Sequence, residues 1–135
     1  MNRTLLFTAI LAAFTAAVHI FVGTPEIQES LFQSALPQEV SLLLYTCWHL
    51  VSVTLSLSAV AFFVSARANI AGSSRNMVKF VSYMWLCYGF VFVAVALLHS
   101  GVSMLLKLPQ WILLLPVGVL GLWGCSNQAL HRTSR

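Results

Sequence analysis

The chain has 135 residues, of which 59% are hydrophobic and 7% are charged. Because soluble domains usually carry about 25% charged residues, this composition excludes a soluble globular protein and indicates one whose apolar surface faces lipid. A net charge of +4 would suggest nucleic-acid binding in a soluble protein, but here the basic residues fall in short connections between apolar runs, where they set orientation, so we expect no nucleic-acid partner.

Four apolar runs can be identified as membrane spans, each of which requires about 20 residues at 1.5 Å rise per residue. They cover residues 5–22, 40–66, 77–98 and 111–125, and the last is short and contains Pro116. No Lys, Arg, Asp or Glu lies well inside any of them, as expected from the cost of a charge in hydrocarbon. The sequence therefore predicts an all-α membrane protein, a single domain over 1–135 with four transmembrane helices in an antiparallel bundle.

In the first loop, Thr24 can cap a short helix that has Pro25 at its first position. Ile27, Leu31 and Ala35 then recur at every fourth residue. This spacing is typical of an amphipathic helix that lies on the outer leaflet, and an ordinary ordered loop is the alternative.

Basic and acidic residues divide between the two sides of this topology. Six of the seven Lys and Arg residues fall on one side, namely Arg3, Arg67, Arg75, Lys79, Arg132 and Arg135. Lys107 falls on the other side, together with all three acids, Glu26, Glu29 and Glu39. The positive-inside rule makes the first side cytoplasmic. We therefore expect a multi-pass protein of the inner (cytoplasmic) membrane with both termini in the cytoplasm and a short cytoplasmic tail over 126–135.

The cysteines Cys47, Cys87 and Cys125 lie within the apolar runs and form no C-x-x-C motif. This spacing predicts neither a disulfide framework nor a thioredoxin-type redox pair. We expect buried thiols that pack as small hydrophobic side chains.

Histidines are the main ionisable residues within or bordering the predicted spans. His19 is 16 residues from Arg3, His49 is 18 from Arg67, and His99 is 20 from Lys79. Because each of these basic residues marks the cytoplasmic foot of a span, the histidines should lie roughly 24, 27 and 30 Å above it. The sequence therefore predicts a single layer of histidines near the outer face.

Neutral imidazoles that share one level can bind a transition metal, so His19, His49 and His99 are the candidate metal ligands. Two imidazoles can instead ligate a haem axially, and His19 and His99 are the candidate pair. The alternative is structural: His19 and His99 reach the headgroups, and His49 forms a hydrogen bond with a neighbouring helix.

Glycines recur every three residues in the fourth span, at Gly118, Gly121 and Gly124. Without side chains, these positions form a flat face. We expect this face to admit either a neighbouring helix or a planar ligand.

Small size, uncharged spans and seams of Ser and Ala favour an accessory or structural membrane protein, such as a subunit, an assembly factor or a stabiliser, with a protein partner or a second copy of the chain. No motif indicates catalysis, and we assign no catalytic residue. Two alternatives stay open. One is a metal- or haem-binding redox protein built on the histidine layer, and the other is a small oligomeric channel or transporter, which the lack of embedded charge disfavours.

Overall fold

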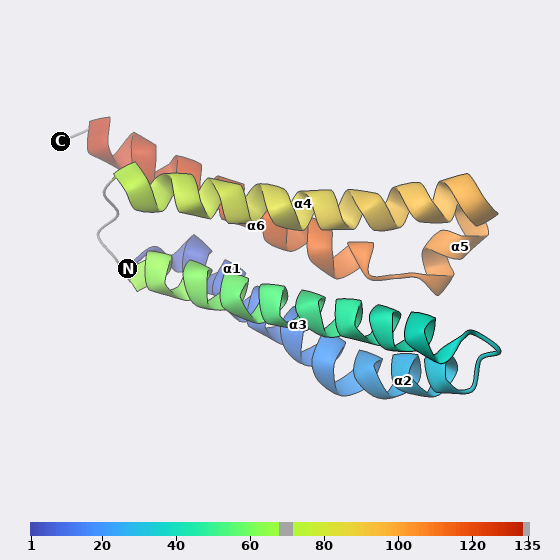
Figure 1. Cartoon of the computed structure of the whole chain (residues 1–135). Helices are drawn as coiled ribbons and strands as arrows, with labels where there is room; N and C mark the ends of the chain where they lie inside the picture. The colour runs from blue at the N-terminus through green and yellow to red at the C-terminus, as the bar shows by residue number, and fades with distance from the viewer. Residues whose placement is uncertain (68–71, 134–135) are drawn as a thin grey trace.

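The computed structural model describes residues 1–67 and 72–133, and the surroundings of their side chains over 1–67 and 75–126 (Figure 1). Over these residues the chain consists of helices and turns, which confirms the predicted all-α fold. The elements are α1 (Arg3–Ala17), the π-helical segment η1 (Val18–Gly23), α2 (Thr24–Phe32), α3 (Gln38–Arg67), α4 (Gly72–Ser100), α5 (Val102–Lys107) and α6 (Trp111–Thr133).

Three helical segments are long and apolar enough to cross a membrane, namely Arg3–Phe32, Gln38–Arg67 and Arg75–Ser100. The apolar part of α6, Trp111–Ser126, is shorter, as the sequence predicted for the last run. Large apolar side chains cover the outside of these helices; Phe80, for example, is 71% exposed and Leu98 is 81% exposed. So much exposed apolar surface is stable in contact with lipid but not with water. The chain is therefore a helical membrane protein.

The first helical segment is longer than the sequence predicted. We expected a span ending near residue 22 and a separate helix on the outer leaflet, but α1, η1 and α2 form one continuous segment, with right-handed helical dihedral angles at both junctions. Thr24 does not cap α2, because the backbone is already helical at Gly23 and Thr24. Its hydroxyl oxygen accepts a hydrogen bond from Trp48 Nε1 of α3 at 3.0 Å. A helix does occupy the first loop, as a continuation of α1 that packs against α3.

The second half of the chain also departs from the predicted boundaries. Helix α4 ends at Ser100, where Gly101 has a φ of 75°, a left-handed value that glycine adopts readily. The connection between the third and fourth predicted spans contains the six-residue helix α5. Helix α6 continues past Pro116 and residue 125 to Thr133, so most of the predicted tail is helical, while residues 134–135 lie outside the described residues.

The helices pack as two antiparallel pairs, α1 with α3 and α4 with α6. At one end, the backbone N–H of Asn2 donates to the Ala66 carbonyl oxygen of α3 at 2.9 Å. The Asn2 side chain donates to the Gly124 carbonyl oxygen of α6 at 2.8 Å, and so joins the two pairs. We call this the closed end of the molecule and the opposite end, which carries α2 and α5, the open end.

Contact between the two pairs is uneven. Helix α6 also packs along α1, whereas α3 and α4 touch over a much shorter length (Figure 1). A hydrogen bond of 2.8 Å from Trp85 Nε1 of α4 to Ser58 Oγ of α3 lies in the buried centre. The pairs are therefore fastened at the closed end and in the middle, and the open end has fewer contacts between them.

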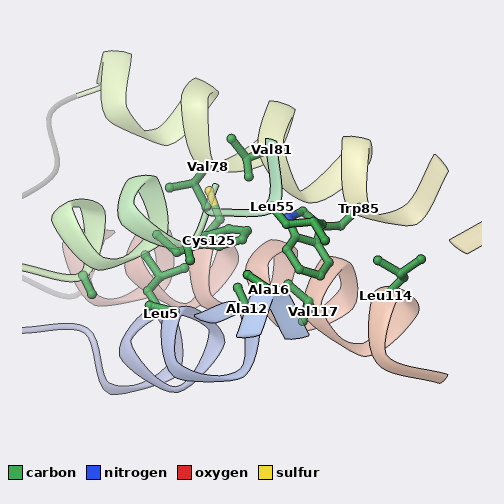
Figure 2. Close-up of a cluster of buried hydrophobic side chains, with 14 residues drawn as sticks. Leu5, Ala12, Ala16, Leu55, Val78, Val81, Trp85, Leu114, Val117 and Cys125 are labelled. Carbon is green, nitrogen blue, oxygen red and sulfur yellow. The ribbon is translucent and has the colours of Figure 1, made fainter. Parts of the chain in front are cut away.

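Small side chains line the contact between the helices. Ala9, Ala12 and Ala16 of α1 are buried, and they face a core around Trp85 (Figure 2). Small residues let helix backbones approach closely in a membrane, where association depends on van der Waals packing and hydrogen bonds because lipid is as apolar as the core. The buried hydroxyl group of Ser82 is satisfied within its own helix, since it donates to the Val78 carbonyl oxygen at 2.7 Å.

The glycine face of α6 packs against neighbouring helices. Residues three apart on a helix differ in direction by about 60°, so the glycines turn progressively around α6. A Cβ atom at Gly118 would lie 2.8 Å from the Ser82 carbonyl oxygen of α4, and one at Gly121 would overlap the Ser82 hydroxyl of α4 and lie 3.0 Å from a Phe62 ring carbon of α3. One at Gly124 would lie 2.8 Å from a Leu5 methyl carbon of α1. These glycines therefore let α6 approach α4 and α1 closely.

The cysteines differ in their surroundings. Cys125 is buried, as predicted, and its thiol lies 3.7 Å from the Arg75 carbonyl oxygen. Cys47 and Cys87 are exposed, contrary to the prediction, because both lie on outward faces of α3 and α4. All three are free thiols.

Substituting Gly118→Val should destabilise the fold by about 1–3 kcal/mol, because the new Cβ meets backbone atoms of α4 that cannot move independently. Val119→Leu on the outward face of the same helix is the matched control and should change the unfolding free energy by less than about 0.5 kcal/mol. Unfolding in mixed micelles, followed by circular dichroism, measures both. Equal stability of the two variants would contradict the close contact of α4 and α6.

Candidate functional site

An aromatic stack joins η1 to α3 at the open end. The ring of His19 lies nearly parallel to the ring of Trp48, with centroids 3.8 Å apart and planes inclined by 16°. The Nε2 atom of His19 is 3.3 Å from the Trp48 carbonyl oxygen, so the tautomer protonated at Nε2 donates to it. Gly23 makes room for the indole, because a Cβ atom there would lie 2.6 Å from Trp48 Cζ2. The stack and the bond from Trp48 to Thr24 fix the direction of this part of the first helical segment.

His49 follows Trp48 in the chain but takes no part in the stack. Its side chain is exposed, and its ring meets Tyr45 edge to face, with centroids 4.5 Å apart and planes at 85°. The Tyr45 hydroxyl in turn donates to Gln28 Oε1 of α2 at 3.3 Å. The hydrogen bonds from this part of α3 to the neighbouring helix are thus made by Tyr45 and Trp48, and not by His49 as one alternative expected.

His99 lies at the end of α4 and is exposed. His19 of η1 stacks on Trp48, next to His49 in α3. His99 belongs to α4, a helix of the other pair. Within residues 1–67 and 72–133, no group of three or more His, Cys, Asp or Glu residues is placed so that it could hold a metal ion. The metal site of His19, His49 and His99 and the haem pair of His19 and His99 thus remain predictions from the sequence.

A cavity of about 660 Å³ lies between the two helix pairs toward the open end. Its walls come from α1, η1, α2, α3, α4, α6 and the residues just before α6, and they include Val51, Leu55, Phe92, Leu113 and Leu114. Pockets that bury small organic molecules have volumes of about 300–1,000 Å³ and are mostly apolar, with a few polar groups that orient the ligand. The cavity has both the size and the lining of such a pocket.

The cavity follows from the uneven packing of the pairs. Toward the closed end, Gly124 of α6 leaves room for Leu5 of α1, and Asn2 joins α1 to α3 and α6. Toward the open end, α3 and α4 touch little, and the two walls carry Val51 on one side and Val91 and Phe92 on the other. These side chains do not fill the space between the pairs.

A few polar side chains interrupt the apolar wall, namely Thr15, His19, Glu26, Tyr88 and Gln110. The Oε1 atom of Gln110 is buried and has no hydrogen-bond partner among the described residues. Leaving such an acceptor unsatisfied costs about 1–3 kcal/mol. The Gln110 backbone is fixed, because its carbonyl oxygen accepts from the N–H groups of Leu113 and Leu114 at 3.1 Å each. Gln110 thus lies at the cavity wall with a fixed backbone, and its side-chain oxygen is enclosed by protein atoms.

Sequence reasoning placed His19 at this site but missed Gln110, Tyr88 and Phe92. The available signal for Gln110 was its position after Leu108 and Pro109, which starts α6 and so brings its side chain to the end of the helix pair. Tyr88 and Phe92 are spaced four residues apart on one face of α4. That spacing is equally typical of a packed core, so it did not identify a cavity.

Comparison with protein-family models, with curated proteins and with solved structures found no match to this chain. The cavity and its polar groups are thus the observations from which a function can be inferred.

Substituting Thr24→Val should lower the unfolding free energy by about 1 kcal/mol, because the valine keeps the shape of threonine but cannot accept the Trp48 N–H. Thr46→Val is the matched control, since the Thr46 hydroxyl is exposed and donates to the Leu42 carbonyl oxygen of its own helix. Thermal unfolding in detergent compares the two. A midpoint for Thr24→Val that equals that of Thr46→Val would show that the bond to Trp48 does not stabilise the fold.

Proposed function

We propose that this chain is a noncatalytic accessory protein of the inner membrane that holds one apolar or amphiphilic molecule in the cavity between its two helix pairs. The observation that carries the proposal is the cavity itself. The atoms that line this space of about 660 Å³, which is open to the surroundings on one side, have no packing contacts across it. A bound molecule restores these contacts.

The composition of the wall supports binding as the function. Trp48, Tyr88 and Phe92 provide aromatic surface, and Leu55 and Leu114 provide the apolar base next to the core. Leu55 and Leu114 are only 2% and 5% exposed, so the base of the cavity is continuous with the packed interior. The outward faces of the helices remain for lipid or for a partner, which is either another membrane protein or a second copy of the chain.

The distribution of charge supports the proposed orientation. Arg3, Arg67 and Arg75 all lie at the closed end, whereas Glu26, Glu29 and Glu39 lie at the open end. By the positive-inside rule, the closed end is cytoplasmic and the cavity faces the outer half of the membrane.

Filling the cavity tests the binding function. Protein purified in a mild detergent should contain about one apolar molecule per chain when it is extracted with organic solvent and analysed by mass spectrometry. Val51→Trp places a larger side chain in the cavity and should reduce this amount at least tenfold. Val53→Trp is the matched control, because Val53 is on the same helix and 55% exposed, and it should retain the wild-type amount.

Two results would contradict the binding function. One is an extract with no stoichiometric apolar molecule from the wild type. The other is an equal content in Val51→Trp and Val53→Trp, because a molecule held on the outer surface would not sense the cavity.

Cysteine labelling tests the orientation. In a chain whose native cysteines are replaced by alanine, Ser34→Cys at the open end should react with a membrane-impermeant maleimide on cells whose inner membrane is intact. Asn76→Cys at the closed end, which is also exposed, should react only after the membrane is opened. The reverse pattern would contradict an arrangement with both termini in the cytoplasm.

A further inference from the structure

We propose that the closed end of the molecule binds the phosphate head group of an anionic phospholipid through Arg3, Arg67 and Arg75. This site lies at the opposite end of the helix pairs from the cavity, so the inference does not rest on the binding function proposed above. The three arginines come from α1, α3 and α4, and all three side chains are exposed. A head group in the adjacent leaflet can therefore reach them.

One hydrogen bond holds the backbone of Arg3 next to that of Arg67. The backbone N–H of Asn2, the residue before Arg3, donates to the carbonyl oxygen of Ala66, the residue before Arg67, at 2.9 Å. Arg3 is the first residue of α1 and Arg67 is the last residue of α3. The two arginines thus lie together at the end of their helix pair.

Two further hydrogen bonds bring Arg75 to the same end of the molecule. The Asn2 side chain donates to the Gly124 carbonyl oxygen of α6 at 2.8 Å. The thiol of Cys125, the next residue of α6, donates to the Arg75 carbonyl oxygen at 3.7 Å. Arg75 is therefore connected to Asn2 through two adjacent residues of α6. We call Arg3, Arg67 and Arg75 the arginine cluster.

The charge of the arginine cluster is not balanced by carboxylate side chains of the chain itself. The sequence contains three acidic residues, Glu26, Glu29 and Glu39. Two belong to α2 and the third to the first turn of α3, so all three lie at the open end. Positive charges that are gathered without a counter-charge favour an anionic partner.

Arg67 is held toward the bilayer. Its guanidinium carbon lies 4.4 Å from the centroid of the Phe63 ring, and Phe63 precedes Arg67 by about one helical turn. Because α3 runs from the open end to the closed end, that turn is deeper in the membrane. A positive charge at the border of the hydrocarbon is costly unless an anion pairs with it. A phosphate group does so well, because it accepts two parallel hydrogen bonds from one guanidinium group.

The apolar surface beside the cluster favours a lipid over a soluble anion. Phe63 and Val64 precede Arg67 on α3, Phe80 follows Arg75 on α4, and all three apolar side chains are exposed. A phospholipid can place its phosphate among the guanidinium groups and its acyl chains along these side chains. Inorganic phosphate or an acidic peptide would match the charge and leave the apolar surface uncovered.

Competition between head groups tests the proposal. The purified full-length protein in an uncharged detergent, at about 50 mM salt so that screening is weak, is incubated with fluorescent dioctanoyl phosphatidylglycerol. Unlabelled dioctanoyl phosphatidylglycerol, dioctanoyl phosphatidylcholine, inorganic phosphate and a hexaglutamate peptide then compete with it. We expect phosphatidylglycerol to compete about tenfold more strongly than each of the other three.

Arg67→Gln should weaken the binding of phosphatidylglycerol about fivefold, the effect of one basic residue at an anionic lipid surface. Lys107→Gln is the matched control, because it removes the same charge from an exposed side chain at the open end. It should leave the affinity within about twofold of the wild type. Circular dichroism confirms that both variants are folded.

Val51→Trp separates this site from the cavity. It fills the cavity at the other end of the molecule and should leave the binding of phosphatidylglycerol unchanged. If it abolishes binding, the lipid lies in the cavity, so the site at the closed end is overturned while the binding function of the cavity stands.

Three other results would overturn the proposal. Equal competition by phosphatidylcholine would show that the phosphate charge is not recognised. Competition by inorganic phosphate or hexaglutamate as strong as that of phosphatidylglycerol would show a site for soluble anions or acidic proteins. Equal weakening by Arg67→Gln and Lys107→Gln would show that net charge, and not the arginine cluster, governs binding.

Discussion

Close approach of α6 to α4 and α1 is the constraint on which the rest of the structure depends. Gly118 and Gly121 leave room for Ser82 of α4, and Gly124 leaves room for Leu5 of α1. In a membrane, where no hydrophobic force drives helices together, this contact provides the packing energy. At the closed end, Asn2 joins α1 to both α3 and α6, whereas the cavity lies toward the open end, between Val51 of α3 and Phe92 of α4.

The sequence was sufficient to predict the fold class and the two long helices in the middle of the chain. An almost uncharged chain with apolar runs over 40–66 and 77–98 predicts long membrane helices, and α3 and α4 contain these runs. The end of the first span was not predictable in the same way. Thr24 and Pro25 are typical of a helix start, but Trp48 takes the threonine hydroxyl as its acceptor, and the helix continues through a π-helical stretch. A contact between residues 24 positions apart overrides the local signal there.

The candidate site shows the same limit. His19 was identifiable because an ionisable residue in an apolar run is uncommon, and the sequence also placed His49 at a similar level. The cavity was not identifiable, since it depends on where two helix pairs stop touching, and single residues do not encode that distance. That Gln110 lies at the cavity wall was found only in the structure. Polar residues before a helix are common, and their surroundings decide whether they bind anything.

The most direct measurement is an experimental structure of the wild-type chain in lipid nanodiscs, with attention to the space between α3 and α4 at the open end. We expect the two pairs to be joined through Asn2 and Gly124 at the closed end and separated around Val51 and Phe92. We also expect an elongated density to fill the cavity. Direct contact of α3 with α4 along their whole length, with the cavity closed by the protein's own side chains, would contradict the binding function.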